Sequence, residues 1–311
     1  MNIITRYSIG FAMLVINLYA TDFNLVNEIE NDEFYKLKKI AVSDEGVFVL
    51  DVGNQVVFQY ALDGEFLHTI SGPGQGPGEF IEPTNIIVNE DTLWILGHTL
   101  MRVGQFIEAE FSGLFQMEKM PIAFCKIANN FIIGQVFSTT FLSKYNSQGI
   151  LQDSTSFQGA ARKKFKNIPF PLFSTLTHMS SSDTHMYLTY EYKNAIEKYD
   201  QNLKLLKSKK IAKKLKEPKV KDGGNNNWYI EGDAIAKDIQ YFNNKVYVLW
   251  MSQIAQVECE GLSQLSIFDE NLKFIENVTI PDCVVGFDIY NGNLFGACNE
   301  PYPKVVIYEI Q

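Results

Sequence analysis

Tyr60-Ala61-Leu62-Asp63-Gly64-Glu65-Phe66-Leu67 carries the pattern that decides the fold of this chain, because the pattern recurs along it. In each copy an aromatic residue precedes an acidic or Asn-containing turn, and hydrophobic residues follow the turn. Copies begin at Tyr145, Tyr199 and Phe268, a degenerate copy runs from Phe106 to Leu114, and Tyr308 begins a copy that is cut off. The aromatic positions lie 39 to 69 residues apart, a spacing that predicts β-propeller blades with insertions in two of them.

A second series of turns alternates with the first. Asx and Gly residues are favoured there because they tolerate the positive φ angles of tight hairpins. A short apolar run follows each turn, and such runs are expected of strands that neighbouring blades bury on both faces. The six turns of this series are Asp44-Glu45-Gly46, Asn89-Glu90-Asp91, Asn129-Asn130, Ser181-Ser182-Asp183, Asn243-Asn244 and Asn291-Gly292.

Together the two series predict an all-β fold, a six-bladed β-propeller of four-stranded antiparallel blades. With the strands of a blade named A to D from the centre outward, the six turns of the second series join A to B, and the five turns of the first join C to D. The sixth blade therefore lacks strand D, and its strand C, Val305 to Tyr308, has an open edge that would promote aggregation. Asn24 to Glu30 has strand character and no other partner, so we predict that this N-terminal strand closes the ring.

One part of the chain also resembles a known family. It contains Val47-Phe48-Val49-Leu50-Asp51-Val52-Gly53-Asn54, then Phe58 to Leu67, then Gly72-Pro73-Gly74-Gln75-Gly76-Pro77-Gly78-Glu79-Phe80 and Pro83. From Leu37 to Val88 the chain is similar to an NHL repeat and resembles the NHL-like propellers of the TolB-like six-blade superfamily, many of which are exported bacterial proteins. Relatives of this fold include lactonases and lyases that hold a metal near the central channel.

The N-terminus predicts an exported protein. A charged start, an apolar run from Ile9 to Leu18 and a small residue at Ala20 are typical of a secretory signal peptide, here residues 1–20, with the propeller domain over 21–311. The apolar run is too short to span a bilayer comfortably. We therefore expect a periplasmic or secreted protein with no membrane span.

The charge distribution bears on the partners. The formal net charge is -9, yet nine lysines and a single acidic residue, Glu217, lie between Lys204 and Lys221. No nucleic-acid partner is expected, because phosphate binding needs a broad basic field. The lysine run itself is interpreted as a solvated loop or a frayed helix.

No catalytic motif stands out. The Gly72 to Gly78 run lacks the lysine of a phosphate loop and precedes a strand, so we expect a structural crossover between blades one and two. The four histidines form no close metal-ligand pair, and no Gly-x-Ser-x-Gly nucleophile motif occurs. The resemblance to metal-holding relatives makes Asn85, Glu231 and Asp233 candidate ligands, whose oxygens suit Ca²⁺; without that metal no cofactor is expected.

Propeller geometry separates two faces. The A-to-B and C-to-D turns lie on one face, the tight-turn face, and the D-to-A and B-to-C connections lie on the other, the long-loop face. Because binding residues concentrate on irregular loops, we expect the long-loop face to bind. The candidate residues are Trp228, Tyr229, Trp250 and Tyr302, with the basic residues Arg162, Lys163, Lys164, Lys166, Lys213, Lys214 and Lys216. For the aromatic residues, core packing is the alternative to ligand contact.

The cysteines suggest one disulfide. An exported protein meets an oxidising compartment, so a bridge is expected among Cys259, Cys283 and Cys298, all placed on the long-loop face, while Cys125 is predicted to be a buried free thiol. With Asn291-Gly292 as a two-residue turn, Cys298 faces Val285 and is only diagonal to Cys283, about 7–8 Å away, which is long for a bridge. Which pair forms is left open.

These observations favour a non-enzymatic extracytoplasmic propeller that binds a small molecule, a glycan or a protein through its long-loop face, with an anionic or aromatic ligand preferred. The alternative is a metal-dependent, lactonase-like hydrolase or lyase at the mouth of the channel. A third hypothesis, a surface scaffold, would require a large exposed apolar patch.

Overall fold

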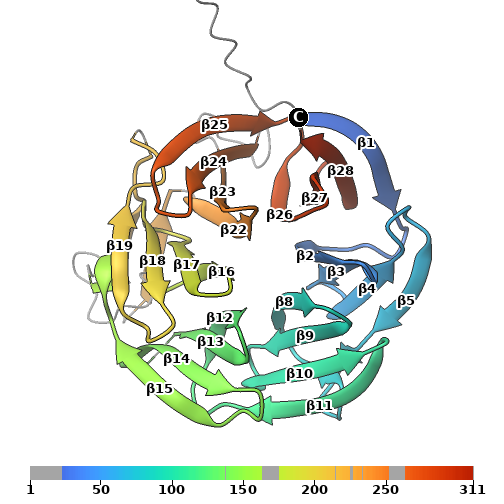
Figure 1. Ribbon diagram of the computed structural model, residues 1–311, viewed down its shortest axis with the longest axis horizontal. Coiled ribbons are helices and arrows are strands. Elements are labelled where there is room, and N and C mark those ends of the chain that lie inside the picture. Colours follow the sequence, from blue (N-terminus) through green and yellow to red (C-terminus); the bar gives the residue numbers. More distant parts are fainter. Residues whose placement is uncertain are drawn as a thin grey trace, which may run out of the picture.

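The computed structural model describes residues 23–136, 138–162, 175–213, 215–224, 227–232, 234–251 and 263–310. The chain forms a ring of six four-stranded antiparallel sheets around a central axis (Figure 1). The predicted six-bladed propeller is therefore confirmed. The predicted signal peptide, residues 1–20, lies outside the described residues.

In every blade the strands follow one another from the centre outward, and the blades below are given in ring order, one to six. The A strands are β2 (Leu37–Ser43), β8 (Pro83–Asn89), β12 (Pro121–Ile127), β16 (Thr177–Ser181), β22 (Ala236–Phe242) and β26 (Val284–Tyr290). The B strands are β3 (Gly46–Asp51), β9 (Thr92–Gly97), β13 (Asn130–Gln135), β17 (His185–Tyr190), β23 (Lys245–Met251) and β27 (Asn293–Cys298). The C strands are β4 (Val56–Tyr60), β10 (Arg102–Ile107), β14 (Thr140–Asn146), β18 (Ile196–Asp200), β24 (Ser263–Asp269) and β28 (Lys304–Ile310). The D strands are β5 (Phe66–Ile70), β11 (Glu110–Gln116), β15 (Leu151–Ser156), β19 (Leu205–Lys209), β25 (Phe274–Ile280) and β1 (Phe23–Glu30).

The turns between strands behave as the sequence predicts. Gly46 in the first A-to-B turn has a φ of 124°, and a Cβ there would collide with the carbonyl oxygen of Tyr60 on strand C of the same blade. Asn243, Asn244 and Asn291 adopt positive φ in the A-to-B turns of blades five and six. Gly and Asx residues adopt these backbone angles at the lowest cost, which explains why they predominate in the turns. Glu90 and Ala128 also adopt positive φ, in the A-to-B turns of blades two and three.

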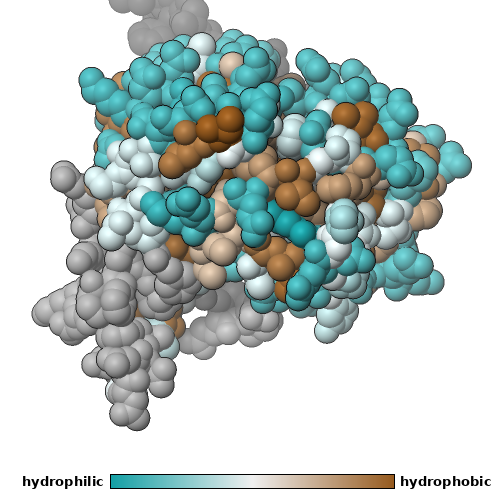
Figure 2. All heavy atoms as spheres, turned by 90° about the horizontal axis from the view of Figure 1, so that it is seen from below, coloured by the Kyte–Doolittle hydropathy of each residue, from teal (hydrophilic) through white to brown (hydrophobic). Residues whose placement is uncertain are grey.

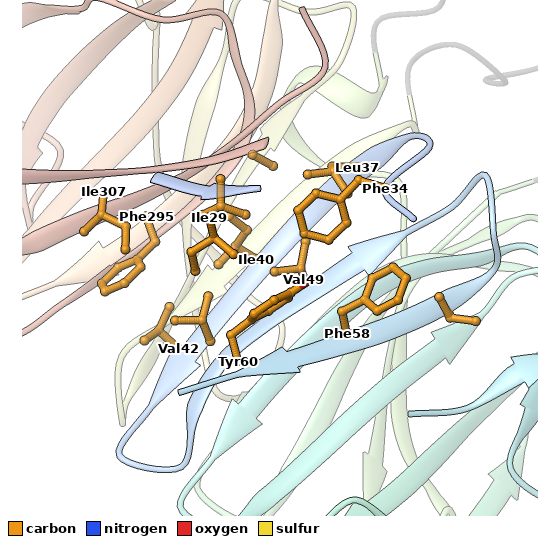
Figure 3. Packing of buried hydrophobic residues seen from close by; sticks show 14 residues of the cluster. Ile29, Phe34, Leu37, Ile40, Val42, Val49, Phe58, Tyr60, Phe295 and Ile307 are labelled. Carbon is orange, nitrogen blue, oxygen red and sulfur yellow. The ribbon is translucent and has the colours of Figure 1, made fainter. Parts of the chain in front are cut away.

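The ring closes through β1. This strand pairs antiparallel with β28, from Phe23 opposite Ile310 to Glu30 opposite Lys304, so the predicted closure is confirmed. Ile29, only 3% exposed, packs with residues of blades six and one (Figure 3). Phe295 and Ile307 reach this cluster from blade six, and Val42 and Tyr60 reach it from blade one.

The glycine-rich crossover between blades one and two has the structural role expected of it. Its ends form the short parallel pair β6 (Gly72–Pro73) and β7 (Glu79–Phe80). The Arg102 guanidinium donates hydrogen bonds to the carbonyl oxygens of Gln75, Gly76 and Glu79 and lies 5.1 Å from the centre of the Phe80 ring. The loop is thus anchored to blade two by one buried cation.

The lysine-rich segment is only in part the solvated loop expected from its charge: Lys210, Lys213 and Lys216 are exposed in irregular structure, whereas both ends of the segment form strands. Leu205–Lys209 is β19, the outermost strand of blade four, and β20 (Lys219–Gly224) pairs with β21 (Asn227–Glu231) in a hairpin outside the blades. Lysine is tolerated in both elements because one face of each strand is open to solvent. The sequence pattern missed these strands because charge, rather than hydrophobic alternation, dominates them.

A buried carboxylate anchors the start of the connection between blades three and four. This connection opens with a short 3₁₀ helix, η1 (Gly159–Arg162). Glu197 of β18 is fully buried and accepts hydrogen bonds from the Ala160 N–H (2.7 Å) and from the hydroxyls of Tyr190 and Tyr199 (2.6 and 2.7 Å). Its role is structural, because every one of these partners belongs to the fold.

The side of the disc formed by the blades drawn lowest in Figure 1 shows hydrophobic residues in small groups separated by hydrophilic ones (Figure 2). Leu114, Ile150 and Leu151 are among the exposed apolar residues of these outer strands and turns. Scattered apolar residues of this kind are normal on a protein surface. Within the described residues, no helix is long and apolar enough to cross a membrane.

Candidate binding site in the central channel

The six innermost strands surround the central channel (Figure 1), and five of them carry a β-bulge at the same place. Each bulge lies one residue inside the long-loop end of its strand, and β16 alone has none. The bulged residues are Lys38, Thr84, Ile122, Lys237 and Val285. A bulge leaves one residue out of the ladder and changes the direction of its side chain. Four of these five residues line a cavity in the channel.

This cavity, the long-loop cavity, has a volume of about 40 Å³. It lies in the half of the channel next to the long-loop face, since the A strands begin there. Its wall consists of Lys38, Lys39, Thr84, Asn85, Ile122, Thr177, His178, Glu191, Lys237 and Asp238. Such a volume suits one small functional group or a few water molecules.

A buried ion pair crosses the channel at the inner end of this cavity. Lys39 Nζ of blade one lies 2.5 Å from Asp238 Oδ1 of blade five, with side chains only 10% and 3% exposed. The carboxylate also accepts hydrogen bonds from the N–H groups of Ile239 (2.8 Å) and Phe287 (3.0 Å). Blade six lies between these two blades, and it carries Gly286 at the corresponding position. A Cβ at Gly286 would collide with the Lys38 carbonyl and lie 3.2 Å from Lys39 Cα, so only glycine permits this approach.

Three polar atoms of the cavity wall are buried without a hydrogen-bond partner in the described structure: Asn85 Oδ1, Thr177 Oγ1 and His178 Nε2. Asn85 and Thr177 are only 8% and 3% exposed. An unsatisfied buried polar atom costs about 1–3 kcal/mol, so such atoms normally bind water or a ligand. Three of them around one cavity therefore indicate a place for a polar guest.

The electrostatics of the long-loop cavity favour an anion. Lys38 is exposed at the open end of the cavity, yet desolvation by the surrounding wall lowers the pKa of its ammonium, and the nearby Glu191 carboxylate partly offsets this effect. Burial also lowers the pKa of His178, so its imidazole is neutral at pH 7 and can offer either a donor or an acceptor. Outside the Lys39–Asp238 pair, the cavity wall holds two lysines, Lys38 and Lys237, and one acid, Glu191. The wall therefore has a surplus of positive charge.

Of the aromatic residues proposed from sequence, Tyr229, Trp250 and Tyr302 do not line this cavity. Trp250 is half-buried and donates its Nε1–H to Ser266 Oγ at 2.9 Å, which matches the core-packing alternative. Tyr302 is 47% exposed and donates to Glu30 Oε1 at 2.8 Å, and Tyr229 is 52% exposed on the β20–β21 hairpin. The Trp228 side chain is not among those described.

The structure describes the side chains of only two of the basic candidate residues. Lys213 and Lys216 are exposed and do not line the long-loop cavity. Lys163, Lys164, Lys166 and Lys214 lie outside the described residues, as does the side chain of Arg162. Their part in ligand binding stays a prediction.

The proposed calcium ligands are divided between two places. Asn85 lines the long-loop cavity, whereas Glu231 is exposed on β21 and pairs with Lys221 Nζ at 2.8 Å. Asp233 lies outside the described residues. In the part of the chain that the structure describes, no three His, Cys, Asp or Glu residues are grouped closely enough to hold a metal ion. Of the two members of the set that the structure describes, Asn85 is the one located at the channel.

The cysteines differ from the expectation in one respect. Cys298 lies opposite Val284, not Val285 as expected, because the bulge in β26 shifts the register by one residue. Cys298 and Cys125 are buried free thiols, and burial raises the pKa of each to about 12. Cys283 is disulfide-bonded. Of the three disulfide candidates, Cys259 lies outside the described residues.

Elimination among the four cysteines leads to a testable pairing. With Cys125 and Cys298 free, we expect Cys259 to be the partner of Cys283. Mass spectrometry of a non-reduced digest of exported protein should show one cross-linked pair of peptides containing these two residues. Alkylation should label Cys125 and Cys298 only after unfolding. A cross-link that contains Cys298 would contradict the pairing.

The channel residues have a recognisable signal in the sequence. Lys38, Lys39, His178 and Asp238 are charged or titratable residues within short innermost strands. Strands buried on both faces rarely hold such residues without a reason. Lys39, Asn85 and Asp238 each lie four residues before the last paired residue of their A strand, so they occupy the same height in the channel. This correspondence can be recognised in the sequence once the strand ends are known.

The fold is that of a six-bladed β-propeller of the NHL-like superfamily. Residues 11–205 match the model of the DUF5128 family, described as a 6-bladed beta-propeller. Because the match spans more than half of the chain, the protein belongs to this family. No curated protein matches the sequence.

Solved structures share this fold at low sequence identity. A member of the DUF4221 family from Bacteroides vulgatus has a TM-score of 0.63 and 8% identity, with 94% of this chain and 98% of that chain covered. A candidate exported protein from Bacteroides fragilis has a TM-score of 0.56 and 10% identity, with 94% and 95% covered. Virginiamycin B lyase from Staphylococcus aureus has a TM-score of 0.58 and 12% identity, with 94% and 100% covered. These similarities establish the fold alone.

Proposed function

We propose that this protein is an extracytoplasmic, non-enzymatic binding propeller that holds the anionic end of a small ligand in the long-loop cavity. The observation that carries the proposal is the pair of buried polar atoms without partners, Thr177 Oγ1 and His178 Nε2, that can donate to an anion in a cavity with surplus positive charge. The third such atom, Asn85 Oδ1, is an acceptor and pairs with a hydroxyl or N–H group of the same ligand. A carboxylate or phosphate group supplies acceptors for the hydroxyl and the imidazole, while Lys38 and Lys237 balance its charge.

The cavity is large enough for only one part of a ligand. About 40 Å³ accommodates one small group, so the rest of the ligand extends toward the long-loop face. This is the face on which sequence analysis placed the aromatic and basic candidates. The channel end of the site is rigid, because the guest contacts strands instead of loops.

Three observations support a location outside the cytoplasm. The sequence predicts a signal peptide over residues 1–20. Cys283 forms a disulfide, and disulfides persist in oxidising compartments. One of the proteins that share the fold is a candidate exported protein.

Binding of small anions tests the proposal. At low ionic strength, we expect at least one probe among oxalate, citrate and inorganic phosphate to raise the melting temperature in a concentration-dependent way. A ligand at 100 times its Kd stabilises by about 2.7 kcal/mol, which corresponds to a shift of roughly 5 °C or more. Lys38→Met or Thr177→Val should reduce the shift at least severalfold.

The matched control is Lys36→Met. Lys36 is exposed and does not line the cavity, but its substitution removes the same charge. It should leave the shift unchanged. Probes that fail to stabilise the wild-type protein, or a shift that survives Lys38→Met, would refute the site.

The lactonase-like alternative predicts a different result. It requires turnover of a lactone that depends on Ca²⁺ and disappears in Asn85→Ala, since Asn85 is the candidate ligand located in the channel. A panel of lactones assayed with and without Ca²⁺ distinguishes this outcome from anion binding alone.

A further inference from the structure

The channel contains a second and larger cavity, the tight-turn cavity, with a volume of about 240 Å³. Asn89, Ser182 and Asp183 lie on its wall at the ends of the A strands or in the turns that follow, so it occupies the half of the channel next to the tight-turn face. Lys39 lines both cavities. The Lys39–Asp238 ion pair therefore lies between the two compartments.

Six residues, one from each A strand, lie at the same height in the tight-turn cavity and form an apolar half and a polar half. We call this height a level; it is two residues closer to the tight turns than the height of Lys39 and Asp238. The residues of blades one to three are apolar or a neutral thiol, and those of blades four to six are polar: Ala41, Ile87, Cys125, then Ser180, Gln240, Asp288. All six line the cavity.

The polar half offers mainly hydrogen-bond acceptors. Ser180 Oγ accepts from the Tyr241 N–H at 2.9 Å and donates to Gln240 Oε1 at 3.2 Å, so its proton is in use. Gln240 Nε2 donates to the Phe287 carbonyl at 2.9 Å. Each oxygen of the Asp288 carboxylate accepts one backbone N–H, from Val42 at 2.9 Å and from Ile289 at 2.8 Å. Further lone pairs of these oxygens are available to a donor.

The carboxylate of Asp288 lacks a neutralising cation. Within the described residues no salt bridge includes Asp288. The nearby Lys39 already pairs with Asp238 at 2.5 Å, and Lys126 donates to Asn89 Oδ1 at 2.9 Å near the mouth. With Asp183 also on the wall, the tight-turn cavity has a surplus of negative charge, opposite to that of the long-loop cavity.

We propose that the tight-turn cavity is a second binding site, independent of the first, and that it takes a small organic amine. The ammonium group donates hydrogen bonds to Asp288, Gln240 and Ser180, and the hydrocarbon part packs against Ala41, Ile87 and Cys125. The volume of about 240 Å³ leaves room for such a body behind the charged group.

The division of the wall favours an amine over a metal ion. Ca²⁺ requires six to eight oxygen ligands around it, and Mg²⁺ requires six. The apolar half of the level has no side-chain oxygen to contribute. A primary ammonium needs only three acceptors on one side and leaves its alkyl or aryl group for the other side.

Benzylamine is a suitable probe, and benzyl alcohol is its neutral control of similar shape. Calorimetry and ligand-observed NMR with the complete mature protein should show benzylamine binding at least about tenfold more tightly, because only the amine forms a charge-assisted bond. Asp288→Asn should remove this preference. Glu45→Gln, which changes the charge equally at an exposed position on the same face, should preserve it.

The pH dependence provides a test that needs no variant. Burial raises the pKa of Asp288 to about 6, and the Val42 N–H and Lys39 partly oppose this shift. Asp238 on β22 also acts on the Asp288 carboxylate and raises its pKa. Lys126 and Asp183 are the other charged residues on the cavity wall. The carboxylate is ionised above this pKa, so benzylamine affinity should fall about tenfold between pH 7.5 and pH 5 as the competent fraction decreases.

The two sites can be separated experimentally. Lys38→Met, which disables the long-loop cavity, should leave benzylamine binding unchanged. Equal affinities for benzylamine and benzyl alcohol, no change in the Asp288→Asn variant, or an affinity constant from pH 7.5 to pH 5 would each overturn the second site.

Discussion

Deletion of residues 23–30 is expected to unfold the propeller or to make it aggregate. β1 is the outermost strand of blade six, and its removal leaves the whole length of β28 without a partner on that side. It also removes Ile29 from the core between blades six and one (Figure 3). In addition it takes Glu28 away from Lys304, whose Nζ lies 2.6 Å from the carboxylate. The expected loss of roughly 5 kcal/mol or more is comparable with the entire stability of a typical domain.

Two point variants within β1 make this test sharper. Ile29 is 3% exposed, and Ile29→Ala should cost about 2–5 kcal/mol, whereas Val26 lies in the bulge at 61% exposure, and Val26→Ala should cost less than about 0.5 kcal/mol. Thermal unfolding by circular dichroism together with light scattering measures both effects. If the deletion left the melting temperature unchanged, closure by β1 would not be what stabilises the ring.

Asp238→Ala is expected to have the next largest effect, about 3–5 kcal/mol of lost stability. The substitution leaves the Lys39 ammonium buried without a counter-ion and removes the acceptor of the Phe287 N–H. Removing one partner of a buried pair is far more costly than removing both, because the remaining charge stays in a medium of low dielectric constant. Denaturant unfolding with an unchanged m-value measures the loss.

The double variant Lys39→Met with Asp238→Asn distinguishes loss of the pair from loss of packing. Asn keeps an oxygen for the Phe287 N–H, and Met fills the space of the lysine chain, so most of the stability should return. The matched control is Glu231→Ala, which breaks the exposed pair with Lys221 and should change stability little. A double variant as unstable as Asp238→Ala would show that the ion pair itself is not responsible.

Much of the architecture was predictable because it depends on local backbone preferences. The turn residues of the two series require positive φ or Asx side chains, and the runs between them alternate or stay apolar according to burial. Six A-to-B turns against five C-to-D turns were enough to predict that β1 completes blade six. Where charge replaced hydrophobic alternation, as in Lys219–Gly224, the same reasoning failed.

The candidate sites were largely beyond this reasoning. Asn85 was identified, but as a calcium ligand together with Glu231, which the structure places on a separate hairpin. The expected position of Cys298 opposite Val285 failed because a single bulge shifts the register, and bulges leave little trace in a sequence. Bulges also set the directions of the Lys38 and Lys237 side chains. The residues of the channel wall could therefore not be predicted by counting residues from one turn to the next.

The sequence by itself determined the strands, the turns and the number of blades, since these follow from interactions between residues close together in the chain. It also determined the strand that closes the ring, because the count of turns left one blade a strand short. Only the tertiary structure decided which side chains share a level of the channel. Lys39 and Asp238 are 199 residues apart, and the Val42 N–H reaches Asp288 across 246 residues. Such contacts exist only after the ring has closed, because closure and the bulges together set the height of each innermost strand relative to the others.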